Sequence, residues 1–538
     1  MLQPQGFERL KNRGSHLAMK LPAPIRALLK PAAYPEHPRW VRLLQTHISY
    51  ILLTPQYVYK IKKPVDFGFL NFTTLKRRLY FLKEELRLNR RLAPTTYIAV
   101  VPVVKTRGGY RVEEERGDVV EYALKMRHLK EECMLHNLIR EDTLPPHTIE
   151  RIARLIAGFH KEARTSPYIS SFGSPRRILG NVEENFRQVA PFVGITISKD
   201  RFEEIKTLTL EFMKAHRRLF ERRTRRGFIR DCHGDLHCEH ISIEDGVEIF
   251  DCIEFNRRFR YSDIVCDMAF LSMDMDFRGR PDLAREFEEQ YFNYRGDKEG
   301  GRLLDFYKAY RAYIRGKVEG FRLKEPEESE EDKSRALVNA ALFFELACQY
   351  LKGYRRPYIL LVCGLTGTGK SAVAGALKER LWGVKVLSTD AVRRRLFNIA
   401  KEEHRRAAYG KGIYTEEARD RVYRELLGEA RLWLRRGRPV IVDATFSKRA
   451  HLELAKRSAK RCGADLYVVE CTLDEKEVRR RLAQRLKEKT LSDATWQTYL
   501  RQKEEREPIE NPTMRLSTTS PPLELADRII STILARRV

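Results

Sequence analysis

The sequence contains no apolar run long enough to cross a bilayer, which takes about 18 residues or more. Its first residues are polar and aperiodic, and they lack the apolar core of a secretory signal. The nine cysteines are scattered, odd in number and without the spacing of a disulfide framework. These absences argue against membrane-spanning and secreted classes of protein, and they predict a cytoplasmic one.

Internal repeats and low-complexity tracts are also missing, which argues against a solenoid or a linker-rich protein. What is abundant is positive charge: the net charge is +28. A basic surface suits anionic partners such as nucleotides, sugar phosphates or nucleic acid, although genome composition or a hot habitat explains arginine richness equally well. The basic stretches lack regular aromatic interleaving, so a stacking platform for single strands is disfavoured, while a basic rim guiding an RNA or DNA end stays open.

The 538 residues exceed what one hydrophobic core accommodates, so several domains are expected. Residues 1–18 are predicted to be a disordered extension, native or vector-derived. Up to residue 352 the pattern mixes strands with long helices, and from residue 353 strands and helices alternate. We therefore predict an α+β domain over 19–352 and an α/β domain with a parallel sheet over 353–538.

The segment Gly364-Leu-Thr-Gly-Thr-Gly-Lys-Ser371 matches the phosphate-binding pattern G-x-x-x-x-G-K-[ST] in full. An apolar predicted strand precedes it and a predicted helix follows. Glycines let backbone N–H groups surround phosphates, the lysine reaches the β and γ oxygens, and the serine can ligate Mg²⁺. We expect ATP to be held by Gly364, Thr366, Gly367, Thr368, Gly369, Lys370 and Ser371.

Polar residues follow the next predicted strands of the C-terminal domain. Asp390 ends one strand, where a carboxylate can accept a substrate hydroxyl proton, and Arg393 can hold a substrate phosphate; capping of a helix is the structural alternative for Asp390. Asp443 ends another strand, where it can position Mg²⁺ or its water. Arg481 and Arg485 share one helix face and can clamp the transferring phosphates, although either is equally well a surface residue.

Residues from about 357 to 510 resemble the small P-loop kinases related to polynucleotide kinase, gluconate kinase and the zeta toxins. The resemblance rests on the P-loop, Ser388-Thr-Asp390-x-x-Arg393, Val442-Asp-Ala-Thr445 and Arg481-x-x-x-Arg485. Those relatives phosphorylate hydroxyls of sugars, nucleotide sugars or nucleic-acid 5′ ends. The resemblance implies that Asp390 is the general base and Arg393 a ligand of the substrate phosphate.

A second kinase pattern lies in Cys232-His-Gly-Asp-Leu-His-Cys-Glu-His240. In the kinase signature H-x-D-x-x-x-x-N, the aspartate orients the substrate hydroxyl, while the asparagine and a later strand-end aspartate hold the metal. His233 and Asp235 fit the first two places and Asp251 the last, whereas His240 replaces the asparagine. Since Mg²⁺ prefers oxygen ligands, His240 puts one metal position in doubt or indicates Mn²⁺.

The strand Tyr57-Val-Tyr-Lys60 resembles the kinase strand that carries the ATP lysine. Lys60 is expected to pair with Glu85 on the following helix, with Lys62 and Glu84 as close competitors. The sequence Asp66-Phe67-Gly68 precedes the catalytic loop, so it is not the metal-binding D-F-G of a kinase. No glycine-rich loop precedes Lys60: the turn is Thr54-Pro-Gln56.

Together these features resemble the aminoglycoside phosphotransferase-like branch of the kinase fold over about 40–320, and the H-G-D-L-H form is typical of that branch. The resemblance implies a bilobal, protein-kinase-like N-terminal domain. A zinc site in the Cys- and His-rich loop is the alternative, but paired metal-ligand spacing is missing.

The whole chain resembles bacterial fusions of such a domain with a P-loop kinase. Our interpretation is a bifunctional kinase using ATP and Mg²⁺, or Mn²⁺, with acceptors that the sequence does not identify. Two alternatives stay open. The first is an RNA or DNA end kinase whose N-terminal domain is a binding module, and the second is a nucleotide-binding regulator with a pseudokinase N-terminal domain.

Overall fold

The computed structural model describes residues 21–68, 70–325, 328–353, 357–381, 383–398, 415–485 and 495–536. The extension predicted over 1–18 lies outside them. The chain divides into two compact units. The first comprises Met1–Leu179, His216–Leu271 and Phe287–Leu304, and the second comprises Gly180–Ala215, Ser272–Glu286 and Asp305–Val538.

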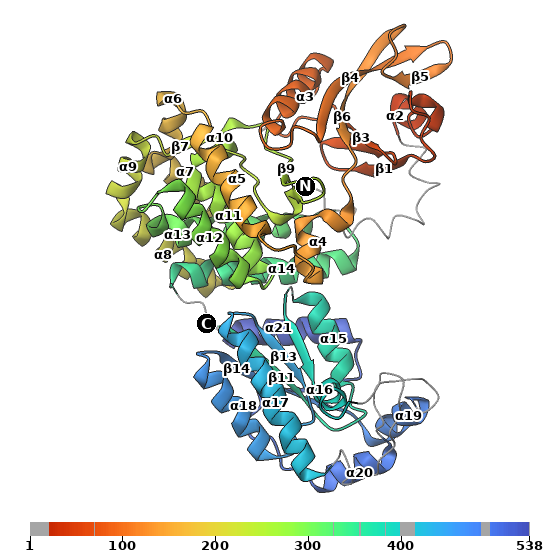
Figure 1. Ribbon diagram of the computed structural model, residues 1–538, viewed down its shortest axis with the longest axis vertical. Coiled ribbons are helices and arrows are strands. Elements are labelled where there is room, and N and C mark those ends of the chain that lie inside the picture. Colours follow the sequence, from red (N-terminus) through yellow and green to blue (C-terminus); the bar gives the residue numbers. More distant parts are fainter. Residues whose placement is uncertain are drawn as a thin grey trace. The chain divides into compact units, whose positions relative to one another are not determined.

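The first unit begins with an antiparallel six-stranded sheet of order β1-β2-β3-β6-β4-β5 (Figure 1). Its strands are β1 (Arg42–Gln45), β2 (Ser49–Leu53), β3 (Tyr57–Lys62), β4 (Tyr97–Thr106), β5 (Gly109–Val112) and β6 (Asp118–Arg127). Helix α3 (Leu75–Asn89) begins after its N-cap Thr74 and packs Leu82 against Tyr97 and Leu124 of the sheet. The predicted helix and strands of this lobe are therefore present.

The predicted strand that carries Lys60 is present as β3, and the turn at Thr54–Gln56 joins it to β2 in an antiparallel hairpin. The structure adds β1, which the sequence analysis did not predict, and with it a tight turn at Thr46–Ile48. The Thr46 hydroxyl accepts from the backbone N–H groups of Ile48 and Ser49 and closes this turn. Two turns, at Thr46–Ile48 and at Thr54–Gln56, therefore precede the strand of Lys60, and neither contains glycine.

The rest of the first unit is mainly helical around very short strands. The loop that carries Asp235 lies between β7 (Ile229–Asp231) and β8 (Ile241–Ser242), and β9 (Glu248–Ile249) follows. Further elements of the first kinase-like region, some of which contribute to the second unit, are α2 (Ala23–Ala27), α4 (Leu135–Glu141), α5 (Thr148–Glu162), α6 (Pro167–Ser170), α7 (Pro175–Val189), α8 (Lys199–Ala215), α9 (Arg217–Arg225), α10 (Arg257–Arg260), β10 (Tyr261–Asp263), α11 (Ile264–Phe277), α12 (Pro281–Arg295), α13 (Gly301–Arg322) and α14 (Glu330–Leu351).

The second unit contains a fully parallel sheet of order β12-β13-β11-β14-β15. Its strands are β11 (Tyr358–Cys363), β12 (Lys385–Ser388), β13 (Val440–Asp443), β14 (Asp465–Thr472) and β15 (Met514–Ser517). The first four were predicted. The edge strand β15 was not predicted, because it is short and a charged residue interrupts its apolar residues.

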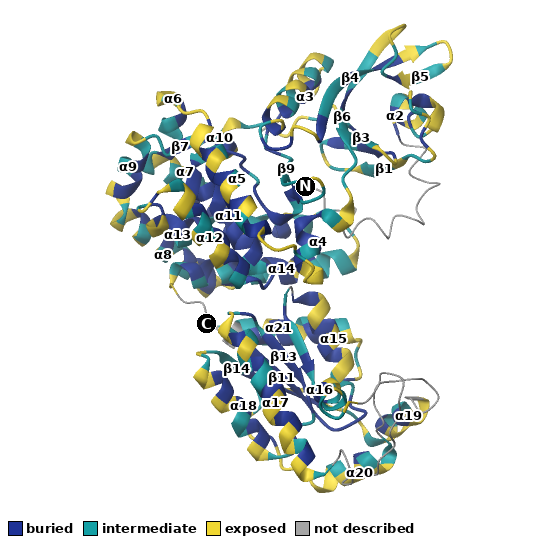
Figure 2. Ribbon diagram, in the orientation of Figure 1, coloured by how far each residue is buried: buried dark blue, intermediate teal, exposed yellow. Residues whose placement is uncertain are grey.

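Helices cover both faces of this sheet (Figure 1). Helices α17 (Glu416–Arg435) and α18 (Arg449–Arg461) pack on one face, and α15 (Lys370–Arg380) and α21 (Pro522–Arg536) pack on the other. The central strands are buried on both sides, as Figure 2 shows in dark blue, which explains their unbroken apolar sequences. The shorter α16 (Thr389–Leu396), α19 (Glu475–Arg485) and α20 (Trp496–Glu504) lie toward the carboxyl ends of the strands.

Within the part of the chain that the structure describes, every helix is too short or too polar to span a membrane.

Candidate active sites

Lys60 lies at the centre of the first site, between two carboxylates. Its Nζ donates to Glu85 Oε1 at 2.7 Å and to Asp251 Oδ1 at 3.0 Å. Burial alone would raise the pKa of Asp251, but the charge of Lys60 holds that pKa well below its usual range. The structure thus joins the expected lysine and glutamate with the expected metal-binding aspartate.

The competing residues have other partners. Lys62 is fully buried and donates to the second oxygen of Glu85 at 2.8 Å and to Glu254. Glu84 instead accepts from Arg87 on its own helix. Glu85 therefore pairs with both lysines, and Lys60 is the one that also contacts Asp251.

The loop that carries Asp235 is anchored from below by Asp267 of α11. The buried carboxylate of Asp267 accepts from the backbone N–H of His233 at 3.0 Å and of Gly234 at 2.8 Å, and from His160 Nε2 at 3.1 Å. Gly234 has φ of +88°, and a Cβ there would lie 2.9 Å from the carbonyl oxygen of Phe259. The loop needs this glycine and this aspartate to hold its shape.

His233 braces the same loop with both ring nitrogens. Its Nε2 donates to the carbonyl of Phe250 at 3.0 Å, and its Nδ1 accepts from the backbone N–H of Asp235 at 3.3 Å. Burial lowers the pKa of His233, which favours this neutral form. The histidine predicted in the catalytic set is thus placed to position Asp235.

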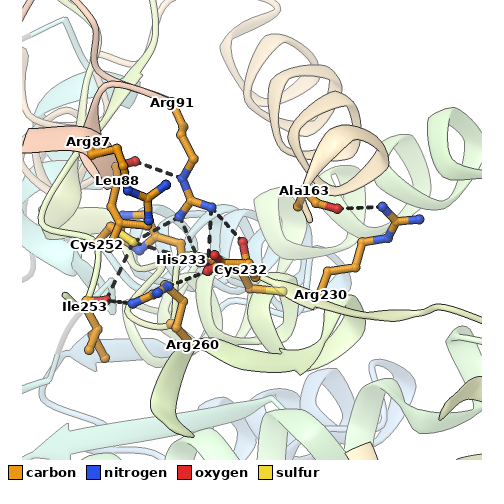
Figure 3. A network of polar contacts seen from close by, with 12 residues as sticks. Arg87, Leu88, Arg91, Ala163, Arg230, Cys232, His233, Cys252, Ile253 and Arg260 are labelled. Carbon is orange, nitrogen blue, oxygen red and sulfur yellow. Dashed lines mark hydrogen bonds and ion pairs between the residues drawn. The ribbon is translucent and has the colours of Figure 1, made fainter. Parts of the chain in front are cut away.

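Arg91, just beyond the end of α3, links the sheet lobe to the loop (Figure 3). Its guanidinium donates to the carbonyl of Asp231 at 2.7 Å, to that of Cys232 at 3.1 Å and to the thiol of Cys252 at 3.3 Å. The sequence analysis did not single out Arg91, because its partners are more than 130 residues away.

His240 stands between Asp235 and Asp251. Its Nδ1 donates to the backbone carbonyl of Asp235 at 2.9 Å, so the lone pair belongs to Nε2, which lies 3.6 Å from Asp251 Oδ2. Burial lowers the pKa of His240 to about 4, which keeps the imidazole neutral. Asp251 itself adopts φ of +62°, an unusual backbone conformation of the kind that concentrates at functional sites.

This geometry fits a divalent metal. His240 Nε2 and Asp251 Oδ2, which lie 3.6 Å apart, are the two atoms that would hold such an ion. The second oxygen of Asp251 is engaged by Lys60, which leaves Oδ2 for the ion. The donor set therefore mixes nitrogen with oxygen, which suits Mn²⁺ better than Mg²⁺.

The second site lies at the start of α15. Ser371 Oγ donates to Asp443 Oδ2 at 2.6 Å, so the two predicted metal-binding residues meet. Lys370 Nζ donates to the carbonyl of Leu365 at 2.8 Å, across the loop that it closes. A Cβ at Gly364 would lie 2.5 Å from the carbonyl oxygen of Cys471, and Gly369 has φ of +83°, so both positions require glycine. The remaining predicted loop residues, Thr366, Gly367 and Thr368, complete the turn.

The proposed substrate residues lie on neighbouring elements. Asp390 is in the first turn of α16, whose N-cap is Ser388, and it pairs with Arg393 at 2.7 Å. Asp390 is therefore not the cap, and about half of its side chain is exposed. Arg481 of α19 donates to the carbonyl of Thr518 at 2.9 Å and would approach a Cβ at Gly369 to 3.1 Å. The side chain of Arg485 lies outside the described residues.

Two residues at the P-loop were missed by sequence reasoning. Gln502 of α20 accepts from the backbone N–H of Thr366 at 3.0 Å, and the hydroxyl of Thr518 donates to the carbonyl of Thr368 at 2.8 Å. Both come from far along the chain, and neither residue type carries a local signal.

Family comparisons agree with the two sites. A family model described as "Phosphotransferase enzyme family" matches residues 75–304, and one described as "AAA domain" matches residues 359–509. Fold and sites together define a phosphotransferase with an N-terminal kinase-like domain of the aminoglycoside phosphotransferase type and a C-terminal P-loop kinase domain.

Uncharacterized proteins of Mycobacterium tuberculosis and Mycobacterium bovis are each 31% identical to this chain over 421 residues. The matches cover 78% of this chain and 81% of each relative. The chain belongs to the family of these proteins.

Solved structures resemble the halves separately. An APS kinase of Mycobacterium tuberculosis, in complex with AMPPNP and APS, is 24% identical and covers 33% of this chain and 98% of its own, with a TM-score of 0.26. A choline/ethanolamine kinase family protein of Mesorhizobium loti is 13% identical and covers 61% and 98%, with a TM-score of 0.35. Nothing about the substrate of this chain follows from either likeness.

Proposed function

We propose that the protein is a bifunctional ATP-dependent kinase in which each domain transfers the γ-phosphoryl group to an alcohol hydroxyl. The N-terminal half of the proposal rests on the contacts that run from Glu85 through Lys60 to Asp251, with His240 lying between Asp251 and Asp235. This supports an active kinase over a pseudokinase, because a domain without phosphoryl transfer would not require all of these charged groups together. The C-terminal half rests on the contact of Ser371 with Asp443 beside Lys370.

In the first site Lys60 would hold ATP phosphates, while His240 and Asp251 would hold the metal ion. Asp235 would accept the proton of the acceptor hydroxyl. In the second site the P-loop amides and Lys370 would hold the phosphates, Ser371 and Asp443 the metal, and Asp390 would be the base. Arg393, Arg481 and Arg485 would neutralise phosphate charge. The metal would supply charge neutralisation on the phosphoryl oxygens.

Both sites are proposed to work in the cytoplasm on small metabolites of the sugar or nucleotide type. All nine cysteines lie in the described part of the chain and are unpaired, as the reducing cytoplasm favours. The net charge of +28 supports an anionic acceptor. An RNA or DNA 5′ end shares that charge, so it belongs in the acceptor test.

The proposal is tested with γ-labelled ATP and pools of small alcohols, sugar phosphates, nucleosides and RNA ends. We expect Asp235→Asn to abolish one labelled product and Lys370→Ala to abolish another, as read by mass spectrometry. Matched controls are Asp66→Asn, in the exposed Asp66-Phe67-Gly68 turn outside the site, and Lys378→Ala, exposed on α15. Retention of both products by both site variants would refute the assignment.

A further inference from the structure

A second histidine of the loop, His237, has no role in the scheme above. Its side chain is buried, with 3% of the residue exposed, and its Nε2 has no hydrogen-bond partner among the described residues. The ring lies against the ring of His240, at 4.0 Å between centroids, and that of Phe270, at 5.4 Å. Packing on both sides prevents the imidazole from turning toward water.

Hydrogen bonding defines where the proton of this imidazole lies. Nδ1 of His237 accepts from the backbone N–H of Glu239 at 3.4 Å, so the ring is neutral and the proton is on Nε2. The neighbouring His240 has the opposite tautomer, because its Nδ1 donates to a carbonyl. One histidine therefore presents a lone pair and the other an N–H donor.

The N–H of His237 faces the place where transfer would occur. Nε2 lies 3.6 Å from Asp235 Oδ2, too far for a good hydrogen bond between them. That separation leaves room for oxygens of a bound group about 2.8 Å from each atom. A buried, unmet donor is unfavourable in a folded protein unless a ligand completes it.

We propose that His237 is a further catalytic residue, whose Nε2–H donates to a non-bridging oxygen of the transferring phosphoryl group. The inference rests on the proposed N-terminal activity. In that step the bond from the acceptor oxygen to the γ-phosphorus forms, and the bond from that phosphorus to the β–γ bridging oxygen breaks. Asp235 takes the hydroxyl proton, ADP leaves, and His237 keeps its proton while its hydrogen bond shortens as charge builds on the phosphoryl oxygens.

Binding of a phosphoryl mimic tests the role without knowledge of the acceptor. The full-length Lys370→Ala protein, in which the P-loop site is silenced, is titrated with ADP and with ADP plus beryllium fluoride, both with Mn²⁺. In this background we expect His237→Ala to leave the affinity for ADP unchanged and to weaken that for the fluoride complex about tenfold or more. His237→Gln, which retains an N–H donor and much of the volume, should recover part of the loss, and added imidazole should rescue the alanine variant.

If beryllium fluoride increases the affinity for ADP equally in the Lys370→Ala protein and in both histidine variants, that result overturns the role of His237 and leaves the kinase assignment intact. Lack of any nucleotide binding by the Lys370→Ala protein would overturn both. Should His237→Ala fail to fold, His237→Phe, which keeps a packed ring but lacks the N–H donor, replaces it in the comparison. A fluoride-complex affinity equal to that of the Lys370→Ala parent would then count against the inference, as would a loss of ADP affinity in the same proportion.

Discussion

At the scale of single residues, the groups proposed to hold a metal ion differ in chemistry between the two sites. In the C-terminal site they are the oxygens of Ser371 and Asp443, which would suit Mg²⁺. The N-terminal site presents the neutral imidazole of His240 beside Asp251. Imidazole is a better ligand for Mn²⁺ than for Mg²⁺, so the two halves should differ in metal preference.

Replacement of His240 by asparagine should therefore shift the N-terminal site toward Mg²⁺. In the Lys370→Ala background we expect His240→Asn to weaken Mn²⁺ binding by at least roughly tenfold, the loss that even a supporting residue of a metal site causes. Electron paramagnetic resonance measures free Mn²⁺, and the coupling of bound Mn²⁺ to imidazole nitrogen should disappear in the variant. Unchanged Mn²⁺ affinity together with the absence of nitrogen coupling in the parent would contradict the ligand role.

His451 in the P-loop domain predicts a pH dependence of stability. Its ring stacks on Tyr423, its Nε2–H donates to Asp420 Oδ1 at 2.7 Å, and burial lowers its pKa. In the unfolded chain His451 takes up a proton as the pH falls through about 6.5, whereas in the folded chain it does so only at lower pH. The free energy of unfolding therefore falls as the pH drops below about 6.5. On lowering the pH from 7.5 to 5.5, the unfolding temperature of this domain should fall more in the parent than in His451→Gln, and equal falls would contradict this.

At the scale of elements, α11 sets the position of the catalytic loop through one side chain. Asp267 accepts two backbone N–H groups of that loop and the ring of His160, whose other nitrogen meets the Tyr291 hydroxyl at 2.8 Å. The loop that carries Asp235 therefore owes its shape to a buried carboxylate and not to regular secondary structure.

Asp267→Asn should loosen this loop. An amide has only one acceptor oxygen, so a buried donor loses its partner, at a cost of about 1–3 kcal/mol in the free energy of unfolding. We expect denaturant unfolding to show that loss and labelled-ATP assays to show loss of N-terminal transfer, with nucleotide binding retained. Asp118→Asn, at an exposed position, is the matched control, and a variant as stable and active as this control would exclude the anchoring role.

Elements with local signals were predictable from the sequence. The Thr74 cap, the apolar strands β11 and β13 and the P-loop all follow from adjacent residues, and the structure has them. The first hairpin and β15 were missed, since short strands with charged residues have weak patterns. Arg91, Asp267 and Gln502 were missed for another reason, because each acts on backbone groups distant in sequence.

At the scale of the whole molecule, the chain joins two kinase-type domains, and the distant contacts that complete each site stay within its own unit. Lys60, Glu85, Asp235 and Asp251 all belong to the first unit, and Lys370, Ser371 and Asp443 to the second. The described residues proposed for each site thus come from one unit, so a single substitution should silence one site and spare the other.

Calorimetric titration of the intact protein with a non-hydrolysable ATP analogue and Mn²⁺ tests this central claim most directly. We predict that the parent binds about two nucleotides per chain, and that Lys60→Met and Lys370→Ala each bind about one. A parent that releases no heat, or a stoichiometry that neither substitution changes, would contradict it.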